Sequence, residues 1–269
     1  AYTGPYRGAG RPEAIHVIER LIDQAARELD IDPVELRRKN FITPDQMPFQ
    51  NPLGQTYDTG EFEILMDKAL GAADWDGYAA RKKASADKGL LRGRGIAYFI
   101  ETSSIFNERM ELRFDPTGDI TIVAGTHNHG QGHETIYRQM VSEWLGIDVE
   151  KIAMVQGDTD RVAFGRGTYA SRSMTVGGNA LRDAADKVIE RAKRVAGVMF
   201  EASADDIEFA DGTFTVAGTD KSAGWTEILF QAFLPMGPTA AIGPGLEAVG
   251  DFAPATPNFP NGCHIAEVE

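Results

Sequence analysis

The chain has 269 residues, of which 42% are hydrophobic, so it can bury a sizeable core as one large domain or two smaller ones. Its net charge of −13 argues against a nucleic-acid or anionic-membrane surface, because such surfaces need a basic face. Cys263 is the only cysteine, which excludes a disulfide framework, a zinc knuckle and a cysteine-held iron–sulfur cluster within this sequence. No apolar run reaches the roughly 18 residues that suggest a membrane span, and we expect a cytoplasmic protein.

Residues 1–90 are predicted to be mainly helical. Pro12 stands where a first helical turn tolerates proline, and apolar residues then recur at helical spacing as far as Leu29. Asp32 and Glu35 have the spacing of a capping box, which predicts a short second helix to about Lys39. After an irregular connection over 40–60, one or two further helices are expected within 61–88.

Residues 91–269 alternate between strand and helix patterns. Strands are expected at 95–101, 108–114, 119–124 and 151–156, with a hairpin at 207–216 and helices at 135–145, about 178–200 and 225–233. The proline-rich residues 235–261 are expected to be rich in loops, and residues 263–269 alternate like a strand. The pattern predicts an α+β fold with mixed sheets and packed helices, divided into domains 1–90 and 91–269. Because the sequence starts in a glycine-rich loop and stops within a strand pattern, we interpret it as a piece of a longer or split polypeptide.

Three glycine-rich loops, at 6–13, 125–135 and 165–173, each lead into a predicted helix. The backbone N–H groups at a helix N-terminus are free to face an anion, and glycine lets the backbone approach it closely. The third loop adds hydroxyls and arginines, which are common phosphate ligands. Two strand–loop–helix units of this kind in one chain indicate a large phosphorylated ligand.

The loop at 125–135 also contains His127, His129 and His133, so a metal site is an alternative. No HExxH pattern is present, and no carboxylate stands at a helical offset from a second histidine. Recognition of phosphate or amide groups by Gly130, Gln131 and Gly132 explains the loop better, since the Gln131 amide offers both donors and an acceptor. A third interpretation is that the loop simply caps the helix that follows it.

The three loops together resemble the molybdenum-cofactor-binding large subunits of the molybdenum hydroxylases, the xanthine dehydrogenase and aldehyde oxidase superfamily. The matching motifs are Tyr6-Arg-Gly-Ala-Gly-Arg-Pro-Glu-Ala14, Gly130-Gln-Gly-His-Glu-Thr135 and Gly167-Thr-Tyr-Ala-Ser-Arg-Ser173, and they are most similar to those of aerobic carbon monoxide dehydrogenase large chains. The motifs at 32–41 and 52–57 fit the same family, so the resemblance extends over essentially the whole chain.

The resemblance implies a molybdenum–molybdopterin cofactor, in its cytosine dinucleotide form, with the metal held by the pterin and by no side chain of this chain. Cofactor-binding residues carried over from the family motifs are Arg7, Gly130, Gln131, Gly132, Thr168, Ala170, Ser171, Arg172 and Ser173. Gly8 and Ala9 correspond to the substrate-side loop. The implied reaction is hydroxylation with oxygen from water, with electrons passed to an iron–sulfur subunit and an FAD subunit. The implied assembly is a dimer of heterotrimers that also contains the remainder of the large subunit.

Two departures from the family pattern affect the expected chemistry. Carbon monoxide oxidisers of this family have a copper-binding cysteine where this chain has Gly8, so the resemblance implies neither copper nor carbon monoxide oxidation here. The catalytic glutamate, the general base, is expected beyond Glu269 and the glutamine near the apical oxygen before Ala1, so no catalytic residue is assigned within the chain. Ala9 replaces a phenylalanine of purine-oxidising relatives, which implies a roomier pocket. The alternatives are a non-redox nucleotide-binding module and a histidine-based metallohydrolase.

Overall fold

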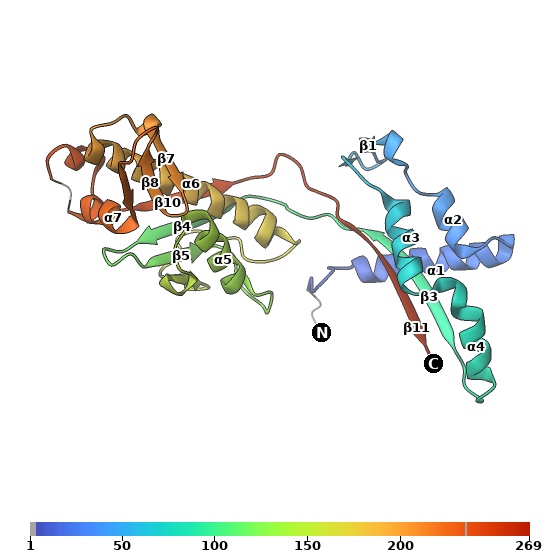
Figure 1. Cartoon of the computed structure of the whole chain (residues 1–269). Coiled ribbons are helices and arrows are strands. Elements are labelled where there is room, and N and C mark those ends of the chain that lie inside the picture. Colours follow the sequence, from blue (N-terminus) through green and yellow to red (C-terminus); the bar gives the residue numbers. More distant parts are fainter. Residues whose placement is uncertain (1–3, 235) are drawn as a thin grey trace. The chain divides into compact units, whose positions relative to one another are not determined.

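The computed structural model describes residues 4–234 and 236–269, which form two compact units. Unit 1 comprises the chain up to residue 103 together with residues 258–269, and unit 2 comprises residues 104–257. The division therefore differs from the predicted boundary between residues 90 and 91. The reason is that β3 (Gly93–Ile100) pairs antiparallel with β11 (Asn261–Val268) along its whole length (Figure 1), so both strands belong with the N-terminal helices.

The helices predicted in unit 1 are confirmed. They are α1 (Arg11–Leu29), α2 (Pro33–Lys39), α3 (Phe62–Ala72) and α4 (Tyr78–Ala86), and a small hairpin of β1 (Phe49–Gln50) and β2 (Thr56–Tyr57) separates the second from the third. The Asp32 carboxylate caps α2 by accepting from the backbone N–H groups of Val34 at 2.7 Å and Glu35 at 3.2 Å. Arg37 of α2 is buried and donates to the carboxylates of Glu19 and Asp23, which ties α2 to α1.

Acid is expected to loosen unit 1 at the end of β11. Arg81 donates two hydrogen bonds to the Glu267 carboxylate, at 2.9 and 2.8 Å, and Arg92 a third at 2.7 Å, and together they lower the pKa of Glu267 from 4.5 to about 2. Because the carboxyl pKa is lower in the folded state, this stabilisation is present above pH 4.5 and is lost as the pH falls towards 2. Urea midpoints measured across that range should fall more steeply for the native chain than for Glu267→Gln. Parallel pH profiles for the two proteins would contradict this prediction.

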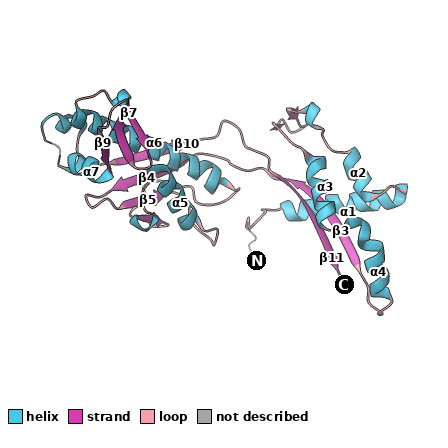
Figure 2. Ribbon diagram, in the orientation of Figure 1, coloured by secondary structure: helices cyan, strands magenta, loops and turns pink. Residues whose placement is uncertain are grey.

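Unit 2 is built around a four-stranded mixed sheet (Figure 2). Its order is β10 (Glu247–Phe252), β4 (Glu108–Phe114), β5 (Ile120–Ala124) and β6 (Ile152–Gln156). β5 and β6 are parallel and are connected through α5 (His133–Leu145), whereas the other neighbours are antiparallel. The remaining elements are α6 (Gly178–Phe200), α7 (Trp225–Phe233) and a second sheet of β7 (Ile207–Ala210), β8 (Thr213–Val216) and β9 (Ser222–Gly224). The core of unit 2 is apolar and includes the fully buried Met110, Leu112, Ile122, Val141 and Leu181.

The stretch expected to be rich in loops also contains β10, a strand that was not predicted. This strand pairs with β4 over six residues and packs against α6. Gly250 approaches α6 so closely that an added Cβ would overlap the Ala180 carbonyl oxygen and the Ala184 nitrogen. A short strand with a central glycine has little β propensity of its own, so its conformation depends on these tertiary contacts.

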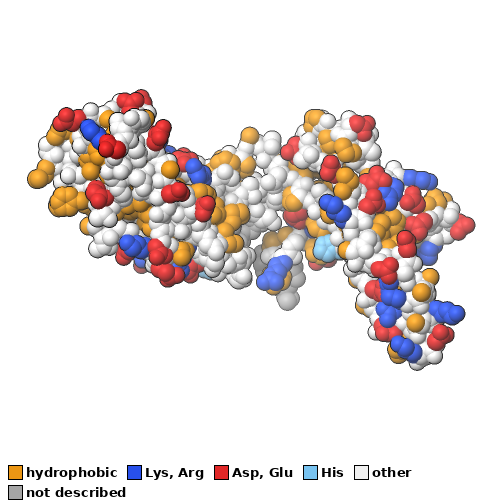
Figure 3. Space-filling view, viewed as in Figure 1, with side chains coloured by type: hydrophobic (Ala, Val, Ile, Leu, Met, Phe, Trp, Pro, Cys, Tyr) orange, Lys and Arg blue, Asp and Glu red, His pale blue; other side chains and the backbone are white. Residues whose placement is uncertain are grey.

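Among the described residues, none of the helices is both long and apolar enough to cross a lipid bilayer. On the face seen in Figure 3, acidic and basic side chains are interspersed over both units. This mixed distribution agrees with an overall charge that is negative without being concentrated in one long acidic run.

Candidate functional site

Two of the three predicted loops lie together in unit 2 because each follows one of the parallel strands. The loop after β5 and the loop after β6 leave the sheet at the same edge, which is where ligands bind in open α/β sheets. The His127 N–H donates to the Thr168 hydroxyl at 3.0 Å, and the Gly167 N–H donates to the Gly125 carbonyl at 3.0 Å. The two loops therefore form a single surface.

Glycines at 125 and 165 allow the two loops to touch. A Cβ added to Gly125 would lie 2.9 Å from the Gly165 Cα, and one added to Gly165 would lie 2.5 Å from the Gly125 carbonyl oxygen. Neither contact leaves room for a side chain. Some glycines of these loops therefore allow the two loops to pack closely together, and the others leave the backbone exposed.

Gly130 and Gly132 lie on the exposed part of the first loop. Both have a positive φ, of 104° and 78°, and an added Cβ at either would meet nothing within 4 Å. The Asn128 side chain accepts from both of their N–H groups, at 3.1 and 3.2 Å, and shapes the turn. The Gln131 side-chain oxygen accepts from the His129 N–H, which leaves the Gln131 amide nitrogen as its donor to a ligand.

The second loop presents a short left-handed segment. Ala170 and Ser171 have φ of 48° and 49°, and Ser171 is exposed at the loop surface. The Thr168 and Ser173 hydroxyls are 2.9 Å apart and bond to each other, with Ser173 buried. A π-helical turn over Ser173–Gly177 then leads into α6, and such turns are frequent at functional sites.

Arg172 does not fit its predicted place among the cofactor-binding side chains. Its guanidinium has no exposed surface and is engaged by Glu108 and by three backbone carbonyls. A cation whose donors are used inside the protein offers none to a ligand. Sequence adjacency to Ser171 and Ser173 does not show which way a side chain faces.

Three residues that organise this surface were not among the predicted site residues. Glu108 lies beneath both loops, Asn128 shapes the first loop, and Gln156 accepts from the Asn128 N–H at 2.8 Å. A signal for Glu108 was available. Every second side chain of a strand faces the same side of the sheet, and Glu108 is in the same alternating set as the buried Met110, Leu112 and Phe114. The alternation in β4 therefore places the Glu108 carboxylate on the core face.

The three histidines of the first loop differ in exposure and position. The rings of His127 and His129 lie 4.8 Å apart at the surface, whereas His133 is buried against Tyr137. Burial, together with the nearby His129 and His127, lowers the pKa of His133, so its imidazole is neutral at pH 7. In residues 4–234 and 236–269, no three His, Cys, Asp or Glu side chains are grouped to hold a metal ion.

The third predicted loop belongs to unit 1. Arg7, Gly8 and Ala9 are exposed in a tight turn in which the Ala9 N–H donates to the Tyr6 carbonyl at 3.1 Å. Gly8 has a φ of 88°, and an added Cβ would lie 2.7 Å from Pro12 Cδ. The turn therefore favours glycine at position 8 both sterically and conformationally.

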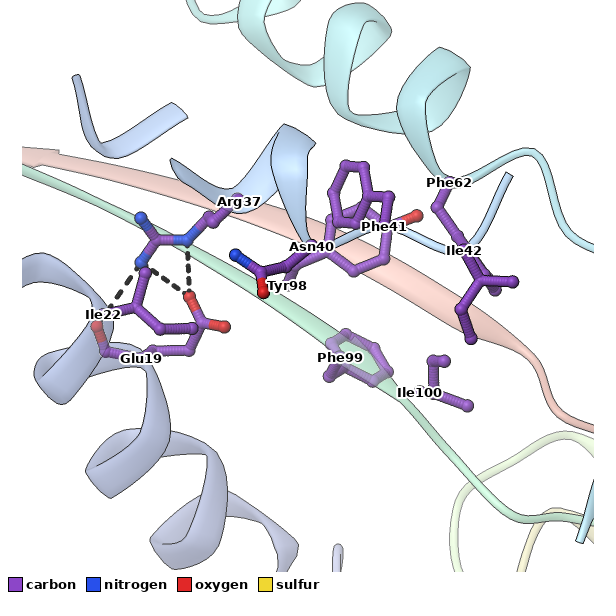
Figure 4. Close-up of a pocket in the computed structure, with 10 residues that line it drawn as sticks. All are labelled: Glu19, Ile22, Arg37, Asn40, Phe41, Ile42, Phe62, Tyr98, Phe99 and Ile100. Atoms are coloured by element: carbon purple, nitrogen blue, oxygen red, sulfur yellow. Dashed lines mark hydrogen bonds and ion pairs between the residues drawn. The ribbon is translucent and has the colours of Figure 1, made fainter. Parts of the chain in front are cut away.

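Unit 1 also contains a mainly apolar pocket of about 210 Å³ (Figure 4). It is lined by Glu19, Ile22, Arg37, Asn40, Phe41, Ile42, Phe62, Tyr98, Phe99 and Ile100. Its charged groups already pair with each other, and the Tyr98 hydroxyl lies 2.7 Å from the Asn261 side-chain oxygen. Burial raises the pKa of Tyr98. These groups stabilise unit 1 and leave no reactive side chain facing the pocket.

Two family models, each described as a molybdopterin cofactor-binding domain, match this chain: one over residues 1–41 and the other over residues 68–269. The carbon monoxide dehydrogenase large chain of Hydrogenophaga pseudoflava is 34% identical over 273 residues, which cover 96% of this chain and 34% of that protein. The nicotine 6-hydroxylase large subunit of Paenarthrobacter nicotinovorans is 30% identical over 281 residues, covering 99% and 34%.

Solved structures agree with these matches. Quinoline 2-oxidoreductase from Pseudomonas putida 86 superposes with a TM-score of 0.84 and 31% identity over 98% of this chain and 35% of its own. The Cu,Mo-CO dehydrogenase gives a TM-score of 0.81 and 33% identity over 95% and 34%. The chain spans about a third of the length of these relatives. It belongs to the molybdopterin cofactor-binding domain family and has an α+β fold.

Proposed function

We propose that this chain forms one wall of the cofactor site in a molybdenum-dependent oxidoreductase that hydroxylates a small substrate. The observation that carries the proposal is the meeting of two glycine-rich loops at the edge where parallel strands β5 and β6 end. Electrons would pass to an iron–sulfur subunit and an FAD subunit, and the remainder of the large subunit would complete the site. A cytoplasmic dimer of such heterotrimers is the proposed assembly.

The loop residues fit a flat, phosphate-bearing cofactor. Open space next to Gly130, Gly132 and Gly167 lets the backbone approach a ring system, and α5 begins directly after Gly132 with no side-chain cap. Gln131 and Ser171 would supply polar contacts. We propose that Thr168, Ala170 and Ser173 hold the shape of the second loop, and that the cofactor is the cytosine dinucleotide form. When bound, it would supply two-electron oxidation of a C–H bond with oxygen taken from water.

Metal and nucleotide analysis of the complex purified with its remaining subunits tests the proposal. We expect about one molybdenum per large subunit, a pterin, and release of cytidine monophosphate on mild hydrolysis. A nucleotide without molybdenum would instead favour a non-redox nucleotide-binding module. Zinc that is lost in His133→Ala would favour a metallohydrolase.

Replacing Ser171 with alanine should reduce cofactor content without unfolding the chain. Ser171 is exposed and its backbone already has the conformation that its neighbour Ala170 adopts, so the substitution should change the stability by at most about 0.5 kcal/mol. Molybdenum and pterin per folded protein are the readout. Ser222→Ala in β9 is a matched control, because Ser222 is also exposed. Equal cofactor content in both variants would remove Ser171 from the site.

We also propose that carbon monoxide is not the substrate. Position 8 has no side chain to bind copper, and the turn there accommodates none without moving Pro12. The purified complex, supplied with copper, should show neither carbon monoxide oxidation nor a copper–molybdenum magnetic coupling. Detection of both would overturn this assignment. We further propose that Ala9, next to Gly8, leaves room for a substrate other than a stacked purine. Tight binding of a purine, measured by titration of the complex, would contradict this.

A further inference from the structure

Glu108 and Arg172 form an ion pair in the interior of unit 2. Neither side chain has any exposed surface, and Arg172 Nη1 lies 2.6 Å from Glu108 Oε2. Such a pair seldom adds much stability compared with apolar residues of the same size, because desolvating both charges is costly. Its presence under the proposed cofactor surface therefore calls for a role other than stability alone.

The Arg172 guanidinium connects two chain segments that are far apart in sequence. Its Nη1 donates to the Gly167 carbonyl at 2.8 Å, which closes the second loop on itself. Its Nη2 donates to the Asn107 carbonyl at 2.7 Å and its Nε to the Ile105 carbonyl at 3.2 Å, which fastens that loop to the segment before β4. A planar, forked cation makes these bonds at the same time, whereas a lysine ammonium does not.

The segments that Arg172 connects are both conformationally strained. Ser104 and Phe106 have φ of 62° and 63°, and Ala170 and Ser171 have φ of 48° and 49°. The Ser104 N–H donates to the Ala170 carbonyl at 3.1 Å, so the strained residues are bonded to one another. Non-glycine residues keep a left-handed conformation only where their surroundings enforce it, and such residues cluster at functional sites.

Glu108 extends the same network to the first loop. Its Oε1 accepts from the Arg109 N–H at 3.1 Å and lies so close to Gly125 that an added Cβ would overlap it. One carboxylate thus lies beneath the start of the Gly125–Gly132 loop and, through Arg172, beneath the Gly167–Ser173 loop.

We propose that Glu108 and Arg172 are positioning residues that hold both loops in the conformation that receives the cofactor. Neither touches the ligand: they act through the backbone of Gly167, Ala170 and Ser171. The role in cofactor binding rests on the function proposed above, whereas the role in holding the loops is a property of the chain alone.

Glu108→Gln tests the proposal, with Glu111→Gln as its matched control. Both glutamates are buried on β4 and paired with arginine, but Glu111 pairs with Arg109 and Arg113 and touches neither loop. Hydrogen–deuterium exchange of the loop peptides containing the Ser104, Gly167 and Arg172 amides should accelerate about tenfold in Glu108→Gln, because a charge-assisted hydrogen bond that holds the loops closed is weakened. Peptides from β5 should be unchanged. In Glu111→Gln the loop peptides should exchange as in the native chain.

Cofactor content of the full complex is the second readout. Glu108→Gln and Arg172→Lys should both bind molybdopterin about tenfold more weakly or worse. Arg172→Lys keeps the positive charge beside Glu108. It provides a second test of the proposal if Glu108→Gln does not fold. Native loop exchange in Arg172→Lys would overturn the positioning role, as would equal exchange in Glu108→Gln and Glu111→Gln. A native complex without molybdopterin would refute the proposed function instead, and the exchange experiment would still decide the role of the pair.

Discussion

Replacing Arg172 with alanine should lower the free energy of unfolding by about 3–5 kcal/mol, because it leaves a buried carboxylate without its cation. Glu108 would lose the 2.6 Å ion pair, and the carbonyls of Gly167, Asn107 and Ile105 would lose their donors in the same step. The effect belongs to unit 2. Urea unfolding followed by hydrogen exchange of peptides from β4 and β5 measures it there.

Arg113→Ala is the control for that experiment. Arg113 also pairs with a glutamate of β4, but 48% of its side chain is exposed, so its loss should cost about 1 kcal/mol or less. If the two alanine variants unfold at the same urea concentration, burial of the Glu108–Arg172 pair has no energetic consequence.

Replacing Gly250 with alanine should destabilise unit 2 by about 3 kcal/mol or more, since an inserted methyl group must displace backbone rather than a side chain. The new Cβ would overlap the Ala180 carbonyl oxygen and the Ala184 nitrogen of α6. Either β10 must separate from α6 or the strand must lose its register with Met110. Thermal unfolding followed by circular dichroism should show a lower midpoint.

Gly95→Ala provides the comparison. Gly95 also lies in a strand, β3, but an added Cβ there meets nothing within 4 Å. Its replacement should leave the stability unchanged or raise it by about 0.5–1 kcal/mol, because glycine loses the most conformational freedom on folding. A Gly250→Ala protein as stable as Gly95→Ala would show that Gly250 does not pack directly against the backbone of α6.

Much of the secondary structure was predictable because its causes are local. Pro12, the Asp32 cap and the apolar spacing before Leu29 are enough to define α1 and α2 within about a residue. The strand β10 was not predictable in this way. Its conformation comes from pairing with β4 and from the close approach of Gly250 to Ala180 and Ala184 of α6, and all of these contacts are with residues more than sixty positions away in sequence.

The candidate site was also predictable only where its features depend on local sequence. The glycines and hydroxyls at 130–132 and 167–173 indicated two ligand-binding loops, because backbone N–H groups, glycine and hydroxyls bind anions in any fold. The family matches confirm that these loops belong to a molybdopterin cofactor-binding domain. The inward direction of the Arg172 side chain was not predictable from the sequence, since it depends on the groups that surround Arg172.

The sequence by itself determined the α+β class, most helices and strands, and the family to which the loops point, because periodicity, capping and motif spacing are encoded over short distances. Only the tertiary structure decided that β3 pairs with β11 across 160 residues of chain, that Glu108 lies beneath both loops, and that Arg172 faces inward. These are long-range contacts. Their energies come from burial and from pairing of distant groups, which no local pattern of residues specifies.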